Sequence, residues 1–218
     1  MLSVVIPSLN ACRTIGPCLE AVSQADELVV VDGGSSDDTV TIAEKLNARI
    51  VRTSRGRGVQ LHTGALAARG DWLLFLHADT ILASGWREAA DLHIASRPDK
   101  AAHFRFRLNA EDWRARLLER AVALRSHLLK LPYGDQGLLI SRALYEEIGG
   151  FKPLPLMEDV DLVRRIGRDR LRSLPVDAVT SAERWDRDGW LRRSARNLLY
   201  LLLYRAGVAP HRLAELYD

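Results

Sequence analysis

Cysteine and long hydrophobic runs are scarce in this sequence. The chain has 218 residues and only two cysteines, Cys12 and Cys18. Two such residues cannot build a disulfide framework, and no paired Cys or His cluster is available for a structural zinc ion. No window contains the roughly 18 consecutive apolar residues of a membrane-spanning helix, and the N-terminus lacks the basic and apolar regions of a signal peptide. We therefore expect a cytoplasmic protein from a reducing compartment.

Several catalytic motifs are also absent. There is no P-loop GxxxxGK[ST], no HExxH and no Gly-x-Ser-x-Gly elbow. The segment Gly56-Arg57-Gly58 begins like a dinucleotide fingerprint, but its third glycine would fall at Leu61. These absences argue against NAD enzymes, P-loop phosphotransferases and zinc proteases.

Lysine is rare as well, since only four of the 31 basic residues are lysines. The planar arginine side chain suits phosphates and carboxylates. Arginine excess also follows from genome composition, however, and the net charge is only +3. The charge balance therefore gives no reason to expect a nucleic-acid partner.

The residues that are present are those of an ordinary globular protein, with 47% hydrophobic and 27% charged side chains. At roughly 100 to 200 residues per domain, we expect one domain over residues 1–218. In the first hundred residues, short aliphatic runs alternate with helix-like spacing. The expected strands are 2–6, 27–31, 49–52 and 72–77, and the expected helices are 14–24, 37–47 and 59–68. This order predicts an α/β fold with a mostly parallel sheet covered by helices on both faces.

The second half is less regular. We expect strands at 102–108 and 137–140, and helices at 112–131 and 190–204. Residues 198–204 are apolar on every helical face and follow Arg192, Arg193 and Arg196. This pattern favours a core helix wrapped by the domain. The alternatives are a homodimer contact or a basic foot at the inner membrane face for a lipid-linked acceptor.

Polar groups follow two of the predicted strands. Asp32 ends a Val-rich run and precedes Gly33-Gly34, at the sheet edge where α/β proteins bind ligands. It can contact a base or ribose, or it can simply close the turn. Asp79 follows the next apolar strand and can hold a divalent cation, with His77 beside it. Taken alone, such an aspartate is more often a helix or turn cap.

Acidic residues also begin a predicted amphipathic helix at Glu158, Asp159 and Asp161. Acids at a helix N-terminus are ordinarily explained by the helix dipole. Beside a substrate pocket, such a carboxylate can instead accept a proton from a hydroxyl nucleophile. Arg57 and its flanking glycines open another helix and can contact a diphosphate.

Read in order, these motifs resemble those of family 2 glycosyltransferases of GT-A fold. The motifs are VVIPSLN at 4–10, VVDGGSSD at 30–37, FLHAD at 75–79, Gly134-Asp135-Gln136 and Glu158-Asp159. The Asp-Gly-Gly and His-Ala-Asp variants are similar to those of a small bacterial group, the rSAM/selenodomain-associated transferase 2 group. The resemblance covers about residues 1–170. It implies a UDP-sugar or other nucleotide-sugar donor, an Mg or Mn ion, and inversion at the anomeric carbon.

The resemblance also implies residue roles. Residues 1–100 would form the nucleotide-sugar half, and 101–218 the acceptor half. Asp79 would bind the metal, Arg57 the diphosphate, and Asp159 would be the base. The nucleoside contacts would be Pro7, Ser8, Asn10 and Asp32, and the acceptor side would hold Asp135, Gln136 and Glu158.

Two departures from the family pattern stand out. Asp32-Gly33-Gly34 replaces the common Asp-Asp-Gly, and His77 occupies the first position of the common Asp-x-Asp. Two other functions stay open, a sugar-phosphate nucleotidyltransferase and a catalytically degenerate binding domain. The nucleotidyltransferase would place its Gly-rich loop after the first strand, where this chain has Pro7-Ser8. Processive synthesis is not expected, because Ser181 replaces the Gln of the Gln-x-x-Arg-Trp element.

Overall fold

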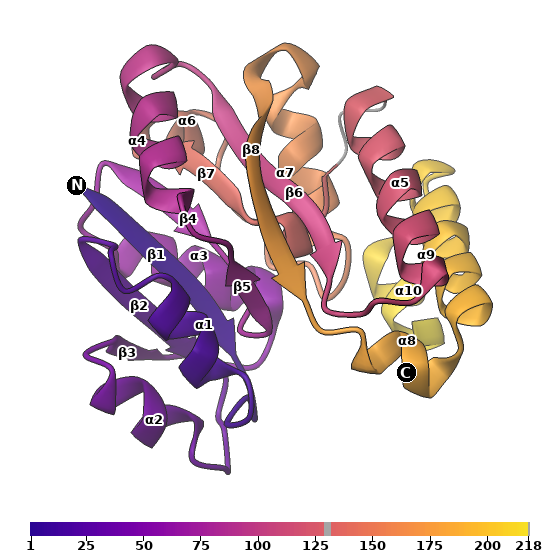
Figure 1. Cartoon of the computed structure of the whole chain (residues 1–218), viewed down its shortest axis with the longest axis horizontal. Helices are drawn as coiled ribbons and strands as arrows, with labels where there is room; N and C mark the ends of the chain where they lie inside the picture. The colour runs from indigo at the N-terminus through magenta and orange to yellow at the C-terminus, as the bar shows by residue number, and fades with distance from the viewer. Residues whose placement is uncertain (129–131, 218) are drawn as a thin grey trace.

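The computed structural model describes residues 1–128 and 132–217, and it contains one curled eight-stranded sheet (Figure 1). The strand order across the sheet is β3-β2-β1-β4-β7-β6-β8-β5. In chain order the strands are β1 (Leu2–Ser8), β2 (Glu27–Asp32), β3 (Arg49–Arg52), β4 (Trp72–Phe75), β5 (Thr80–Leu82), β6 (Ala101–Leu108), β7 (Leu138–Ser141) and β8 (Leu171–Thr180).

The first four strands form the parallel part of the sheet. β1 pairs in parallel with both β2 and β4, and β2 pairs with β3. Each connection is a helix, which is the crossover that parallel neighbours require. The pairing of Ser8 with Asp32 brings the carboxyl ends of β1 and β2 to one edge. The predicted parallel α/β half is confirmed, although β4 ends two residues before His77.

Helices cover both faces of this sheet. Val4 and Ile6 pack in a cluster with residues of α1 (Ile15–Ala21), α2 (Thr39–Lys45) and α4 (Trp86–Ser96). Val5 belongs to the opposite cluster, with α3 (Arg57–Ala67), α6 (Arg142–Glu147) and α7 (Glu158–Ile166). Gly64 explains how closely α3 approaches the sheet, because a Cβ there would lie 2.4 Å from Val5 Cγ1.

The C-terminal half makes the sheet mixed. β7 runs antiparallel to β4 and β6, β6 and β8 are parallel, and β5 runs antiparallel to β8. β5, β8, α4 and α6 were not predicted from the sequence. The strand β8 was missed because it contains Pro175, and proline has no backbone N–H to donate to a neighbouring strand. The register of β6 and β8 shifts there, from His103–Ser173 pairing to Arg105–Asp177 pairing.

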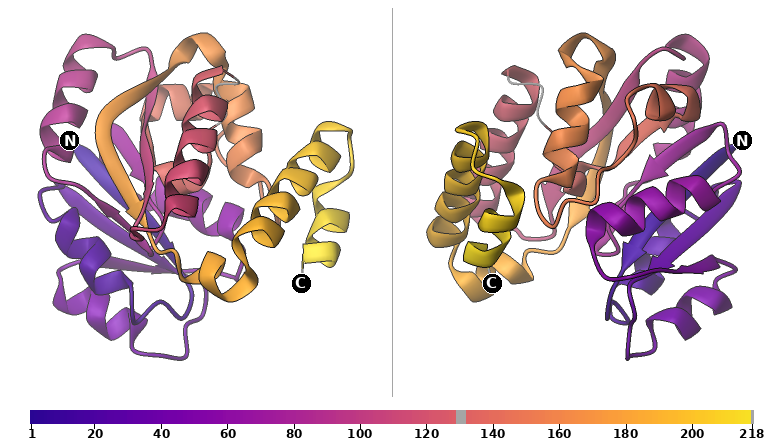
Figure 2. Two further views of the ribbon diagram at one scale, coloured as in Figure 1. Left: turned by 45° about the vertical axis from the view of Figure 1, so that its right-hand side comes forward. Right: turned by 180° about the vertical axis from the view of Figure 1, so that it is seen from behind.

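Four further helices form a separate layer beyond β6 and β8 (Figures 1 and 2). They are α5 (Trp113–Leu128), α8 (Glu183–Asp188), α9 (Trp190–Arg205) and α10 (Pro210–Tyr217). Their core contains Ala115, Val122, Trp185 and Trp190. The predicted end of the helix 112–131 lies outside the described residues.

The predicted core role of the C-terminal apolar helix is wrong. In α9 only Trp190, Arg193, Tyr200 and Leu201 are buried, whereas Leu198, Leu199 and Leu202 are more than half exposed. The domain covers one side of this helix and leaves these three leucines on the outside. The homodimer and membrane alternatives stay predictions, and no helix in the described part of the chain is long and apolar enough to cross a membrane.

Candidate active site

The segment from His77 to Asp79 lies at the centre of the carboxyl edge of the sheet. It follows β4 and turns directly into β5, with the Thr80 amide donating to the His77 carbonyl at 3.1 Å. Two contacts hold the segment in place. The Cys18 thiol of α1 donates to the same carbonyl, and the Thr80 hydroxyl lies 3.1 Å from that of Thr180 in β8.

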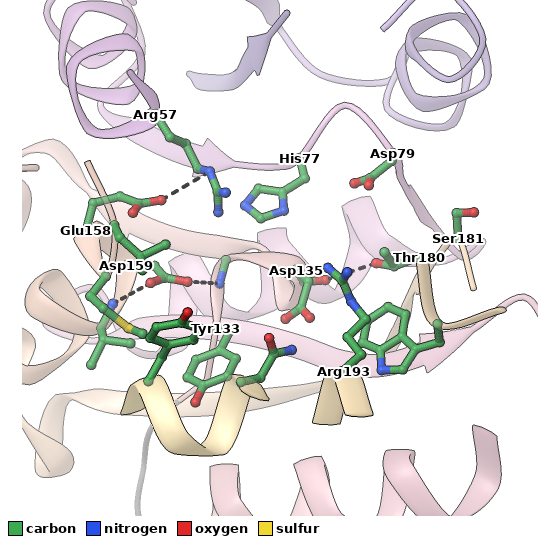
Figure 3. Close-up of a pocket in the computed structure, with 17 residues that line it drawn as sticks. Arg57, His77, Asp79, Tyr133, Asp135, Glu158, Asp159, Thr180, Ser181 and Arg193 are labelled. Carbon is green, nitrogen blue, oxygen red and sulfur yellow. Dashed lines mark hydrogen bonds and ion pairs between the residues drawn. The ribbon is translucent and has the colours of Figure 1, made fainter. Parts of the chain in front are cut away.

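A pocket opens at this edge, between the sheet, the start of α7 and the inner side of α9 (Figure 3). It encloses about 890 Å³ of empty space, including the solvent at its mouth. Its polar and charged lining includes five of the predicted site residues, Arg57, Asp79, Asp135, Glu158 and Asp159. These residues are separated by up to 102 positions in the sequence, so only the fold brings them together.

Asp159 is held firmly at the first turn of α7. Its Oδ2 accepts a hydrogen bond of 2.8 Å from the Gly134 amide, and its Oδ1 accepts one of 2.7 Å from the Val160 amide. The Gly134 contact depends on glycine, because a Cβ there would lie 2.5 Å from His77 Nε2. The carboxylate is therefore oriented by backbone groups at the pocket wall, as a proton-accepting group should be.

Glu158 precedes Asp159 in α7 and is almost fully buried. Its Oε1 is 3.2 Å from Arg57 Nε, an ion pair across the pocket, although the two are not aligned for a hydrogen bond. Burial raises the pKa of Glu158 to about 7, the charge of Asp159 also raises it, and Arg57 opposes both. Gly58 lets the start of α3 approach the backbone of residues 152–154, since a Cβ there would lie 2.3 Å from the Lys152 carbonyl oxygen.

Asp135 projects from the 3₁₀ turn η1 (Gly134–Gln136) on the floor of the pocket. Burial raises the pKa of its carboxyl to about 6, Arg125 lowers it, and the charges of Asp159 and Asp79 raise it further. Its Oδ1 is shielded from solvent and has no hydrogen-bond partner among the described residues. A carboxylate oxygen in that situation is suited to an incoming cation or hydroxyl.

The residues around Asp79 fit a divalent cation that binds together with a phosphate-bearing ligand. Among the described residues no group of three His, Cys, Asp or Glu side chains forms a ready-made metal site. Magnesium usually binds through one or two carboxylates together with substrate phosphates and water. Asp79 and Asp135 line the same pocket, and the Asp79 charge acts on Asp135. This donor set therefore suits a metal completed by a diphosphate.

The predicted nucleoside residues lie at the neighbouring ends of β1 and β2 and do not line this pocket. Asp32 accepts hydrogen bonds from the Gly34 and Ser35 amides, so its carboxylate closes the turn. Asn10 accepts a hydrogen bond of 2.9 Å from the Ser36 amide. Ser8 differs from these two, because its buried hydroxyl has no partner among the described residues. Pro7 lies within β1, opposite Val31.

Gln136 lies behind the pocket. Its side chain is buried, accepts a hydrogen bond of 3.0 Å from the Ser126 hydroxyl and donates one of 3.2 Å to the Phe104 carbonyl. It faces a second cavity between β6 and α5. These contacts give Gln136 a positioning role for η1, and its assignment to the acceptor side stays a prediction.

The wall of the pocket that α8 and α9 form was not predicted from the sequence. Arg193, Asn197 and Tyr200 of α9 line it together with Trp185 of α8. Their spacing of four and three residues puts the α9 side chains on one helical face. This polar stripe in the sequence indicates a polar helix face, but it lies among leucines, and the segment was therefore interpreted as an apolar core helix. The side chain of Arg184, which precedes Trp185, lies outside the described part of the structure.

Comparisons with known sequences agree with the motifs. The sequence model for glycosyl transferase family 2 matches residues 3–154. A PGL/p-HBAD biosynthesis glycosyltransferase of Mycobacterium bovis is 38% identical over 93 residues, which is 38% of this chain and 36% of the relative. A glucosyl-3-phosphoglycerate synthase of Mycolicibacterium paratuberculosis is 35% identical over 94 residues, 37% of this chain and 29% of the relative. The matches thus span about a third of these relatives.

Solved structures show the same architecture. Glucosyl-3-phosphoglycerate synthase from Mycobacterium tuberculosis, in complex with Mg²⁺ and UDP, aligns with a TM-score of 0.69 and 24% identity over 95% of this chain and 80% of that one. Staphylococcus aureus TarS with UDP-GlcNAc gives 0.65 and 19% over 82% and 58%. The fold is therefore GT-A, while the narrower rSAM-associated group stays a prediction. Because the family match extends over most of its length, the chain belongs to glycosyl transferase family 2.

Proposed function

We propose that this chain transfers a sugar from a nucleotide-sugar donor, with UDP as the expected nucleotide, to a hydroxyl group held in the pocket. The observation that carries the proposal is the gathering of Asp79, Asp135 and Asp159 around one pocket at the carboxyl edge of the sheet. The synthase complexes with UDP and Mg²⁺ or Mn²⁺ support it through the shared fold. The family match favours transfer over the nucleotidyltransferase alternative.

A divalent cation would be held by Asp79, with Asp135 close by. When bound, such an ion neutralises charge that develops on a departing diphosphate. The protein contributes the placement of these carboxylates at the end of β4 and in η1. His77 packs against Gly134 and so fixes the distance between the two segments.

Asp159 would act as the base in an inverting displacement. The acceptor hydroxyl loses its proton to the Asp159 carboxylate, its oxygen forms the new bond to the anomeric carbon, and the bond from that carbon to the diphosphate breaks. The two backbone amides that bind Asp159 keep it in position for this step. Glu158, the residue before Asp159, would orient Arg57 through the ion pair.

Calorimetric titration with UDP, with and without Mn²⁺, tests the donor and metal parts of the proposal. The parent should bind UDP more tightly when Mn²⁺ is present, and Asp79→Ala should lose this metal dependence while keeping its melting temperature. Asp91→Ala, an exposed change on α4, is the matched control. UDP binding by the parent that does not depend on Mn²⁺ would contradict the proposed role of the cation. Normal binding without any UDP release from a UDP-sugar would identify a degenerate, binding-only member.

A further inference from the structure

Helix α9 turns some of its polar side chains inward and some of its leucines outward. Its polar residues Arg193, Asn197 and Tyr200 face the pocket, whereas Leu198 and Leu202 are mainly exposed. A surface helix normally buries its apolar side and turns its polar side to water. The Tyr200 hydroxyl donates to the Leu216 carbonyl, so the polar side chains of this face that a pocket ligand can meet are Arg193 and Asn197.

Arg193 is the most unusual residue on this face. Its side chain is only 7% exposed and, in Figure 3, its guanidinium extends into the pocket. Nη1 donates a hydrogen bond of 2.5 Å to Asp188, and the guanidinium carbon lies 5.1 Å from the Trp185 ring centre. Nε is buried and has no hydrogen-bond partner among the described residues. A buried cation is costly unless its donors are paired.

Asp188 is shared with other arginines and is not reserved for Arg193. The same carboxylate lies 2.8 Å from Arg187 and 3.5 Å from Arg196, in addition to its contact with Arg193. Three guanidinium groups therefore share one carboxylate. The other arginine in the pocket, Arg57, is already paired with Glu158. An anion from outside the protein would complete the arrangement at Arg193.

We infer that Arg193 forms the subsite for an anionic group, a carboxylate or a phosphate, on the acceptor. The inference rests on the proposed function and names its substrate class. Asp79, Asp135 and Asp159 line the same pocket, and their negative charges disfavour an anion beside them. An acceptor with one anionic end is thereby oriented, its charged group at α9 and its hydroxyl at Asp159. Arginine suits this task because its planar donors match carboxylate and phosphate oxygens.

The first test uses inorganic phosphate as the probe and compares Arg193→Gln with Arg196→Gln. Arg196 lies one turn further along α9 and also approaches Asp188, but it does not line the pocket. Phosphate should raise the melting temperature of the parent and of Arg196→Gln. In Arg193→Gln its apparent affinity should be roughly 10- to 100-fold weaker, the usual effect of losing a charged hydrogen-bond partner. Equal phosphate affinity in the parent and Arg193→Gln would overturn the subsite.

The second test separates the acceptor from the donor diphosphate as the source of the anion. Phosphate should still stabilise the parent at saturating UDP and Mn²⁺, because the two ligands occupy different places. Loss of the phosphate effect when UDP is bound would assign Arg193 to the diphosphate and overturn the acceptor subsite. Absence of UDP binding in every variant, with phosphate binding intact, would contradict the proposed function instead.

Arg193→Lys is a second variant that keeps the proposal testable if Arg193→Gln does not fold. Lysine keeps the charge and can still reach Asp188, but it lacks the planar pair of donors. A folded lysine variant should bind phosphate about threefold to tenfold more weakly than the parent, which is less than the loss expected when a charged hydrogen bond is removed outright. With glycerate and glycerol as a matched acceptor pair, Arg193→Gln should raise KM for glycerate alone. An equal change in KM for glycerol would contradict anion recognition.

Discussion

The ends of β1 and β2, where the donor nucleoside is predicted to bind and which we call the donor edge, differ from the pocket in how their polar groups are paired. At the ends of β1 and β2, Asp32 accepts amides of its own turn, and Asp37 accepts a hydrogen bond from the Thr39 hydroxyl. In the pocket, Asp135 Oδ1, Glu158 Oε1 and Arg193 Nε are buried without hydrogen-bond partners among the described residues. Buried polar groups are ordinarily paired. Apart from the Ser8 hydroxyl, which is also buried without a partner among those residues, the donor edge is therefore paired scaffold, whereas the pocket holds several unpaired groups that a ligand can complete.

The largest effect should come from Asp159→Asn. A positioned base contributes roughly 10² to 10⁴ in rate, and asparagine keeps the shape of the side chain without accepting the proton. We expect sugar transfer to fall by that factor while UDP and Mn²⁺ affinities stay close to those of the parent. Single-turnover transfer and calorimetry measure the two quantities. Transfer within a few-fold of the parent rate would remove Asp159 from the base position and leave it as a helix cap.

The pH dependence of stability should reveal the buried Glu158 carboxyl of the pocket. The pKa of Glu158 is raised from 4.5 to about 7, so its stabilising contribution is complete below pH 4.5 and is lost as the pH rises through 7. Glu158→Gln should therefore reduce the fall in unfolding free energy between pH 5 and pH 8, by on the order of 1 to 3 kcal/mol. Urea unfolding at the two pH values measures it. An unchanged fall would mean that Glu158 is charged throughout this range. Asp135, whose pKa is also raised, should leave a smaller slope of the same sign.

A substitution at Gln60 tests whether the donor edge is scaffold. This buried side chain donates to the Ser8 carbonyl at 2.9 Å and to the Val31 carbonyl at 2.8 Å, and so joins β1 to β2. Gln60→Leu leaves both carbonyls without these donors and should cost about 1 to 3 kcal/mol of stability. Gln24→Leu, at an exposed position, is the control. Equal unfolding midpoints for the two variants would show that the edge does not depend on this link.

The smallest effect should come from the outer side of α9. Leu198 and Leu202 are 56% and 53% exposed, so replacing both with Gln should change the unfolding free energy by less than about 0.5 kcal/mol per site. Leu201→Gln, at a position only 3% exposed, should be strongly destabilising by comparison. Light scattering and liposome flotation then decide between the two remaining predictions for this surface. A parent dimer that the double variant disrupts would indicate a subunit contact, and lost flotation would indicate a membrane contact.

Local sequence patterns were sufficient for the parallel half of the fold. Runs such as Leu28–Asp32 are continuous apolar strands followed by glycine turns, and the spacing between them has room for one helix each. Right-handed crossovers then leave few ways to arrange such units. The same logic places Asp32 and Asp79 at the carboxyl edge from the sequence alone. These positions depend on neighbours in the chain, which a single sequence displays.

The rest was decided by contacts between distant segments. β8 contains a proline and pairs with β6 across more than sixty residues, so its own pattern did not reveal a strand. The leucine-rich sequence of α9 is typical of a core helix, yet the fold turns Leu198 and Leu202 outward and buries Arg193. Whether a side chain is inside depends on which surface its helix meets, and hydrophobicity alone does not specify that. The sequence by itself thus determined the sheet edge and its carboxylates, while tertiary packing decided which residues face them across the pocket.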